Sequence, residues 1–276
     1  MKKALLALVA ATAFTGSAFA ADMAVKAPPM APPPPPPPTF TGCWLSGGVG
    51  YGLFDQENTF FANDGPGTPV IEEFGTTTTG GKGWLGRVGG GCDYQFSGFG
   101  GFGQGFVIGA FADYDWTNIR GTQSVAGDFF ADEKMDNQWA VGGRVGWVPL
   151  PGLLTFVSGG YTQAHFNGAE VFNNEFPFIG TPVIGGAVFR DGRTFNGWFI
   201  GGGEEYAFNW LPVPGLFWKT EYRLSEFNRQ DVFFFQPGAP VGDIAFNAEK
   251  KWVQTITTSL VWRFNFLGGA PVAARY

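Results

Sequence analysis

The C-terminal stretch 254–266, QTITTSLVWRFNF, alternates between apolar and polar side chains, and this alternation limits the possible folds of the chain more than any other feature. Successive side chains of a β-strand point to opposite faces of a sheet, so the stretch is predicted to be a strand with one apolar and one polar face. The apolar face carries Ile256, Leu260, Trp262, Phe264 and Phe266, with Thr258 as its polar exception. Aromatic residues at the end of such a face are typical of a lipid-facing wall where it meets water.

Seven further stretches alternate in the same way, and their connections are long and short in turn. Long outer loops and short periplasmic turns are the layout of outer-membrane barrels. The eight predicted strands are 42–52, 83–95, 104–116, 137–148, 153–164, 197–208, 215–226 and 252–266. The predicted long connections are 53–82, 117–136, 165–196 and 227–251. The predicted fold class is all-β, an antiparallel up-and-down transmembrane β-barrel of eight strands, or of ten if 182–190 adds a strand.

Two kinds of barrel fit this alternation. A lipocalin-like soluble barrel places its apolar face inside, whereas a membrane barrel places it outside, against lipid. The small residues favour the membrane barrel, because Gly142 and Gly146 share a face with Arg144, and Gly89 shares one with Arg87. Glycine weakens a strand that faces solvent, but in a narrow lumen it makes room for long charged side chains.

The composition agrees with a membrane wall. Charged residues make up only 14% of the chain, whereas a soluble protein carries about a quarter. Beyond the N-terminal region no stretch offers about 18 consecutive apolar residues, so spanning helices are not expected. The formal net charge of −6 argues against a nucleic-acid partner, which would need a basic patch.

The N-terminus predicts export. A basic start, a short apolar run and an Ala-Phe-Ala sequence form a signal peptide over 1–20, with cleavage between Ala20 and Ala21. The segment 21–41 is a proline-rich periplasmic segment, and its run 27–38 is predicted to be a stiff polyproline II spacer. Its alternative role is to bind peptidoglycan or another periplasmic partner. The barrel is expected over 42–266, followed by a tail over 267–276.

The strand parity places ten charged side chains on the polar face, inside the barrel. They form either a structural network of paired charges that plugs the lumen or the lining of an ion-selective channel. We favour the plug, because an eight-stranded barrel is filled by its own side chains and unpaired buried charges are costly. The ten residues are Arg87, Asp93, Asp113, Asp115, Arg144, Glu205, Lys219, Glu221, Arg223 and Arg263. Glu204 is a misfit, since its parity points to lipid, and we place it near the periplasmic rim.

The two cysteines, Cys43 and Cys92, fall at the periplasmic ends of adjacent predicted strands and on the same outward face. The periplasm is oxidising, so a disulfide is predicted, with two separate thiols as the alternative. No metal site is expected from a chain with one histidine and no cysteine cluster.

No nucleophile and base come together in the sequence, so we expect neither catalytic residues nor a cofactor, and no enzyme. The only histidine, His165, is read as a surface residue, with haem or metal capture as the alternative. The predicted long loops carry acidic and aromatic residues that extend the strands or form a surface patch, namely Glu72, Glu73, Asp132, Glu133, Phe233, Phe234 and Phe235.

Several motifs together resemble the small outer-membrane barrels of alphaproteobacteria that are known as porin-family or outer-membrane immunogenic proteins. They are GCWLSGGVGYG at 42–52, GCDYQF at 91–96, DYDWTNIRG at 113–121, GGYTQAHF at 159–166, NGWFIGGGEEYA at 196–207, FWKTEYR at 217–223, VWRFNF at 261–266 and the tail GGAPVAARY. The resemblance implies an OmpA-like barrel that is exposed and antigenic at the cell surface. Its aromatic end, Trp262, Phe264 and Phe266, resembles the C-terminal signal that barrel-assembly machinery recognises.

We therefore expect a protein of the cell outer membrane, surrounded by lipid and lipopolysaccharide, with a structural role in envelope integrity. One alternative function is a narrow porin-like diffusion channel for small solutes, which would depend on the charges of the lumen. The other is an adhesin or haem-capturing surface protein, which would depend on the long aromatic loops and His165.

Overall fold

The computed structural model describes residues 39–63, 71–96, 103–125, 129–172, 188–190, 192–208, 210–211, 213–235 and 245–264. The predicted signal peptide with its cleavage site, nearly all of the proline-rich segment, Phe266 and the tail lie outside these residues. Across the described ranges, no helix is long and apolar enough to cross a membrane.

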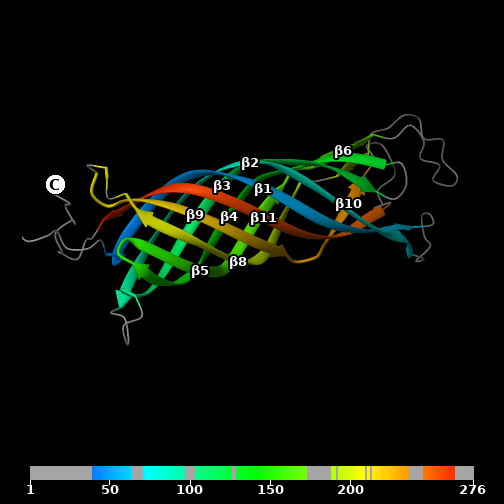
Figure 1. Cartoon of the computed structure of the whole chain (residues 1–276). Coiled ribbons are helices and arrows are strands. Elements are labelled where there is room, and N and C mark those ends of the chain that lie inside the picture. The colour runs from blue at the N-terminus through cyan, green and yellow to red at the C-terminus, as the bar shows by residue number, and fades with distance from the viewer. Residues whose placement is uncertain are drawn as a thin grey trace, which may run out of the picture. The chain divides into compact units, whose positions relative to one another are not determined.

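Eight long strands form a closed antiparallel ring (Figure 1). They are β1 (Gly42–Asn63), β2 (Ile71–Phe96), β3 (Gly105–Val125), β4 (Phe129–Leu150), β5 (Leu153–Phe166), β8 (Arg193–Ala207), β9 (Leu216–Phe227) and β11 (Ala245–Phe264). Each strand pairs with the next in this order, and β11 pairs with β1 from Cys43 opposite Phe264 to Ala62 opposite Ala245. The predicted eight-stranded up-and-down barrel is thus confirmed. No strand edge is left unpaired in the hydrocarbon, where an unpaired edge would be very costly.

Three short strands, β6 (Ala169–Phe172), β7 (Val188–Arg190) and β10 (Gln230–Phe235), continue the barrel beyond β5, β8 and β9. The pairing of β6 with β7 keeps the register in which β5 pairs with β8, and β10 pairs with β7 and β11. These strands are therefore the outer ends of β5, β8 and β9. The ten-stranded alternative is wrong for the described chain.

The eight predicted strands lie where the structure has strands, but much of the predicted long connections is strand as well. β1 continues to Asn63 and β2 begins at Ile71, so the segment 53–82 is mostly a long hairpin. The predicted outer ends of the strands lie where outward-facing apolar residues stop. Beyond the bilayer the outer face meets water, so the strands continue without that apolar signal.

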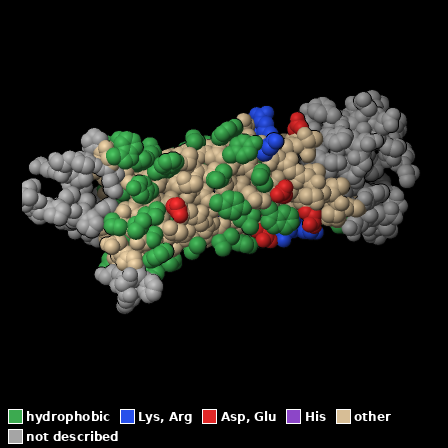
Figure 2. All heavy atoms as spheres, viewed as in Figure 1, with side chains coloured by type: hydrophobic (Ala, Val, Ile, Leu, Met, Phe, Trp, Pro, Cys, Tyr) green, Lys and Arg blue, Asp and Glu red, His purple; other side chains and the backbone are tan. Residues whose placement is uncertain are grey.

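The outward face is apolar over a band bounded by two rings of aromatic residues. Trp84 and Tyr94 lie about ten residues apart along β2, which in a tilted strand matches the ~25 Å apolar band of membrane barrels. Figure 2 shows hydrophobic side chains over this part of the wall, with acidic and basic side chains gathered beyond it. The outer ring contains Trp84, Trp116, Trp139, Tyr161, Trp198 and Tyr222, and the periplasmic ring contains Tyr94, Phe96, Phe106, Trp147, Tyr206, Trp218 and Trp262.

The closing strand β11 has the two faces that its sequence predicts. Ile256, Leu260 and Trp262 are exposed on the outside, whereas Thr257 and Arg263 are buried inside. The described part of the strand ends at Phe264, and the last two residues of the predicted strand, 265 and 266, lie outside the described residues. On β8, Glu204 is exposed on the outer wall, as its parity predicts, and it lies opposite Thr155 and Thr220 on the neighbouring strands.

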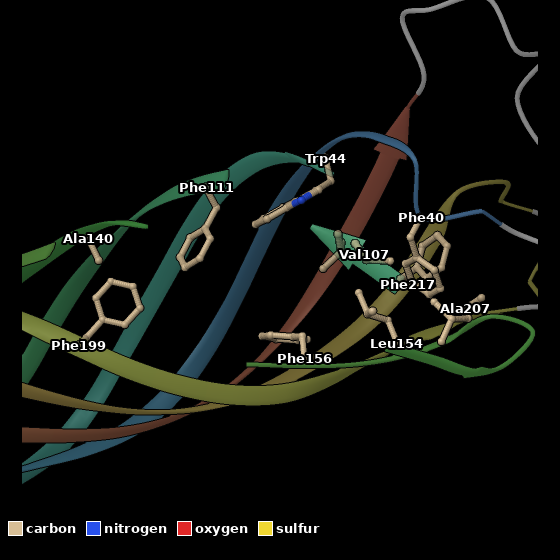
Figure 3. Packing of buried hydrophobic residues seen from close by; sticks show 12 residues of the cluster. Phe40, Trp44, Val107, Phe111, Ala140, Leu154, Phe156, Phe199, Ala207 and Phe217 are labelled. Atoms are coloured by element: carbon tan, nitrogen blue, oxygen red, sulfur yellow. The ribbon is translucent and has the colours of Figure 1, made fainter. Parts of the chain in front are cut away.

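Apolar side chains fill two layers of the barrel interior. The first layer lies toward the periplasmic end, where Figure 3 shows Phe40 and Phe217 close to Leu154 and Ala207. The second layer lies toward the outer end and includes Phe54, Phe166, Phe195 and Phe227. Charged side chains occupy the space around and between these layers.

Candidate functional site in the barrel lumen

The structure places all ten of the charged residues assigned to the polar face inside the barrel. None of them is more than 9% exposed. They gather in two clusters, each with equal numbers of acidic and basic groups. The periplasmic-side cluster consists of Asp93, Arg144, Glu205 and Arg263, and the central cluster consists of Arg87, Asp113, Asp115, Lys219, Glu221 and Arg223.

The periplasmic-side cluster is a closed square of alternating charge. Arg144 donates to both carboxylate oxygens of Asp93 and also to Glu205, at 3.3 Å. Arg263 donates from Nε to Glu205 at 2.6 Å and from Nη1 to Asp93 at 2.9 Å. Each guanidinium therefore bridges both carboxylates, which satisfies the rigid fork of arginine donors.

The central cluster contains two bidentate pairs. Arg87 binds both oxygens of Asp115 at 2.7 Å, and Arg223 binds both oxygens of Asp113 at 2.7 and 2.9 Å. Glu221 joins the two pairs, because it lies 3.0 Å from Arg223 and 3.6 Å from Arg87. Lys219 completes the cluster at 3.5 Å from Glu221.

Aromatic rings cover the faces of these cations. The Arg144 guanidinium lies 4.7 Å from the centre of the Trp44 ring, and Arg223 lies 4.4 Å from that of Phe199. A cation over an aromatic face gains energy, and more so when water is excluded. The rings thus stabilise the buried charges and also occupy the remaining space in the lumen.

Phe40 closes the periplasmic end of the lumen. Its side chain is fully buried and lies 5.3 Å from the ring of Phe217, while its carbonyl accepts a hydrogen bond from Arg263 at 3.0 Å. Its backbone N–H donates to the side chain of Gln95 at 2.9 Å. Phe40, directly before the first strand, is therefore held in the mouth of the barrel, and the strand alternation alone did not reveal this contact.

A third group of charges lies toward the outer end, and sequence reasoning missed it. Lys251 is fully buried, lies 2.8 Å from Glu133 and 3.0 Å from Glu249, and lies 4.5 Å from the centre of the Phe166 ring. Glu133 was expected in a loop, but it belongs to β4 and is only 1% exposed. The register of β4 shifts between Met135 and Asn137, which reverses the strand parity and turns Glu133 inward.

Gly109 on β3 shows why the lumen needs small residues. It pairs with Asp93 on β2 and with Arg144 on β4. A Cβ at this position would collide with the Asp93 carboxylate. Asp93 and Arg144 can therefore meet across β3 because Gly109, which lies between them, has no side chain.

Cys43 and Cys92 form a disulfide between β1 and β2. The two residues lie directly opposite each other in the strand register, at the periplasmic ends of their strands. The predicted disulfide is therefore present, and it links the first two strands of the barrel.

The remaining candidate residues lie on the outer wall and its extensions. The Nδ1 atom of His165 lies 3.0 Å from the hydroxyl of Thr194. Phe233, Phe234 and Phe235 belong to β10, so this aromatic run extends a strand. The side chains of Glu72 and Glu73, and of these three phenylalanines, lie outside the described part of the structure.

Comparison with known proteins identifies relatives of the predicted kind. The chain is 27% identical over 239 residues to the 31 kDa outer-membrane immunogenic protein of Brucella melitensis. The matched region covers 84% of this chain and 90% of the relative. The protein of the same name from Brucella suis matches equally. These relatives confirm the resemblance drawn from the motifs. No model of a known protein family matches the chain.

Solved structures with similarity to this chain include three outer-membrane proteins. Neisserial surface protein A is 11% identical, covers 78% of this chain and 97% of its own, and gives a TM-score of 0.33. Ail of Yersinia pestis is 10% identical, with coverages of 80% and 99% and a TM-score of 0.33. The protease OmpT of Escherichia coli is 10% identical, with coverages of 82% and 99% and a TM-score of 0.38. The barrel assignment itself rests on the strand pairing described above.

Proposed function

Because this protein is a β-barrel of the outer membrane, we propose that it serves as a structural, surface-exposed wall element whose lumen is closed to solutes. The observation that carries this proposal is the square of Asp93, Arg144, Glu205 and Arg263, in which every charge is held by two opposite charges. Such a cluster gives a passing ion no free partner. It also cannot move aside without leaving buried charges unpaired, which costs several kcal/mol.

The apolar layers support a closed lumen at both ends. Phe40 and Phe217 lie against each other at the periplasmic end, and Phe166 and Phe195 lie against each other toward the outer end. All four side chains are nearly fully buried. Eight-stranded barrels have an interior just wide enough for side chains to fill, so these two layers support a lumen without a continuous path for water.

The long outer strand ends support a surface role. β2 and β3 continue well past Trp84 and Trp116, which mark the outer limit of the apolar band. Barrel parts beyond this limit are in contact with the medium. The Brucella relatives are named immunogenic proteins, and a similar exposure would make this chain antigenic and a contributor to envelope integrity.

Planar bilayer recording of the refolded protein tests the closed lumen. We expect no stable single-channel steps at low voltage, and no uptake of small sugars in liposome swelling. A matched variant, R223S/D113S, removes both partners of one central pair and is expected to leak. This leak is the positive control, because it shows that the assay detects an opened lumen. Stable steps from the unmodified protein would contradict the proposal and favour the diffusion-channel alternative.

A further inference from the structure

Two exposed cations lie side by side on the outer wall. Lys82 on β2 is directly opposite Arg120 on β3, and Arg120 is directly opposite Lys134 on β4. Like charges directly opposite each other destabilise a sheet. Among the described residues, Lys82 and Arg120 have no ion-pair partner, and the Arg120 guanidinium only donates to the side chain of Asn118, at 2.9 Å.

The acidic groups nearest this pair are Asp55, Asp132 and Asp136, and among the described residues none of them forms an ion pair with Lys82 or Arg120. Asp136 lies 2.6 Å from Lys134, and Asp132 accepts a hydrogen bond from Thr122. On the strands across the barrel, by contrast, exposed cations have acidic partners. Arg229 lies 2.6 Å from Glu57 and Lys250 lies 2.8 Å from Glu226. The pair on β2 and β3 therefore presents two cations that no described carboxylate binds directly.

This pair lies at the height of the lipid headgroups. Trp84 follows Lys82 by one outward position on β2, and it is 68% exposed. On β3, Trp116 is 57% exposed and precedes Arg120 toward the outer end. Because exposed tryptophans mark the boundary between apolar band and headgroups, the two cations lie just outside it. Figure 2 shows that the basic and acidic side chains visible beyond the hydrophobic band lie close to one another.

A shallow apolar groove of about 620 Å³ lies on the same strands, on the membrane side of the tryptophans. Its floor contains small residues such as Gly89 and Ala112, and its walls include Val88, Tyr114 and Trp139. A groove of this kind within the apolar band is accessible to lipid chains. The arrangement thus combines a cationic pair above with an apolar groove below.

We propose that the outer face of β2–β4 binds one phosphate-bearing glycolipid of the outer leaflet. Lys82 and Arg120 would hold a phosphate, and one acyl chain would lie in the groove beneath it. Arginine suits phosphate because its donors match two oxygens at once, and lysine adds a point charge. A bound phosphate would also remove the repulsion between the two cations.

Native mass spectrometry of the refolded full chain, titrated with bisphosphorylated lipid A, tests this site. We expect one tightly bound lipid, and an affinity at least about tenfold lower for K82Q/R120Q, because charge-assisted contacts are lost. A112L leaves the charges in place but fills the groove, and should also weaken binding. K250Q removes a paired cation from the other side and should change the affinity less than about twofold.

Retained heat-modifiable gel mobility shows that each variant is folded. Equal binding of dephosphorylated lipid A would overturn the phosphate contact. If K250Q lost as much affinity as K82Q/R120Q, binding would depend on general charge attraction and not on this site. Unchanged binding by A112L would show that the acyl chain does not lie in the groove. None of these outcomes bears on the closed lumen, because Lys82, Arg120 and Ala112 all point outward.

Discussion

At the scale of residues, the barrel interior depends on complete pairing. Each arginine of the periplasmic-side cluster touches two carboxylates and is covered by an aromatic ring, as Arg144 is by Trp44. Pairs of this kind add little net stability compared with an apolar core, but removing one member is strongly destabilising. The cluster therefore fixes the positions of four strands rather than simply adding stability.

Replacing Arg144 with methionine tests this dependence. The substitution leaves Asp93 and Glu205 with only Arg263 between them, so we expect the free energy of unfolding to fall by about 3–5 kcal/mol. Urea unfolding in lipid vesicles, followed by gel mobility, measures the change. The matched substitution Lys250→Met breaks a partly exposed pair with Glu226 and should cost less than about 1 kcal/mol. Similar losses in both variants would contradict the role of burial.

At the scale of elements, β11 contributes to the lipid-facing wall, to the charges of the lumen and to the closure of the barrel. Its outward face meets lipid, its inward face carries Arg263, and its backbone closes the sheet against β1. Trp262 lies in the periplasmic aromatic ring and 5.4 Å from the ring of Phe264. At the end of its described part, Phe264 pairs with Cys43 of β1.

Trp262→Ala is therefore expected to lower the assembled fraction more than deletion of 268–276. The substitution removes a half-exposed aromatic side chain from the membrane boundary, a loss of about 2 kcal/mol. The tail deletion leaves every strand pair of β11 in place. Heat-modifiable mobility of membrane fractions measures assembly, and an equal loss from the tail deletion would overturn the assignment of the signal to the strand.

Strand parity predicts which face a side chain occupies only as far as the register is unbroken. It was sufficient for Arg87 and Arg223, which lie in regular parts of β2 and β9. It was insufficient for Glu133, because one extra residue near Asp136 reverses the faces of β4. A single bulge has no clear signature in a polar stretch, where both faces contain polar residues.

At the scale of the whole molecule, the barrel has a continuous wall in the bilayer and an interrupted wall beyond it. β5, β8 and β9 each break before continuing as β6, β7 and β10. The backbone N–H of Asn167 and that of Asn228 still donate across these breaks, to Lys134 and Asn196. The part of the outer wall formed by β6, β7 and β10 is therefore paired in shorter units than the wall in lipid.

Hydrogen exchange should reveal this division. We expect amides of β6, β7 and β10 to exchange at least about tenfold faster than those of β9, because short strands open locally at a lower free energy. Mass spectrometry of the protein in nanodiscs, after deuterium labelling and digestion, measures both groups in one sample. Uniform protection along β9 and β10 would show that the wall behaves as one unit.

The arrangement of the lumen shows which parts of the molecule the sequence could predict. Alternation revealed the eight strands and the inward side of ten charges, because both depend on neighbouring residues. It did not reveal that Arg263 meets Asp93, since strands far apart in the chain meet there through the closure of the ring. The position of Phe40 in the mouth depends on the same closure and had no local signature.

The alternating square and the central cluster together contain as many positive as negative charges. These two clusters carry no net charge, so they create little electrostatic potential along the barrel axis. Among the described residues, the third group differs, because Lys251 is paired with two carboxylates, those of Glu133 and Glu249. If thermal motion parted the side chains for a moment, a leak would meet no preference for the sign of an ion at the two neutral clusters, whereas the excess carboxylate of the third group would favour cations toward the outer end.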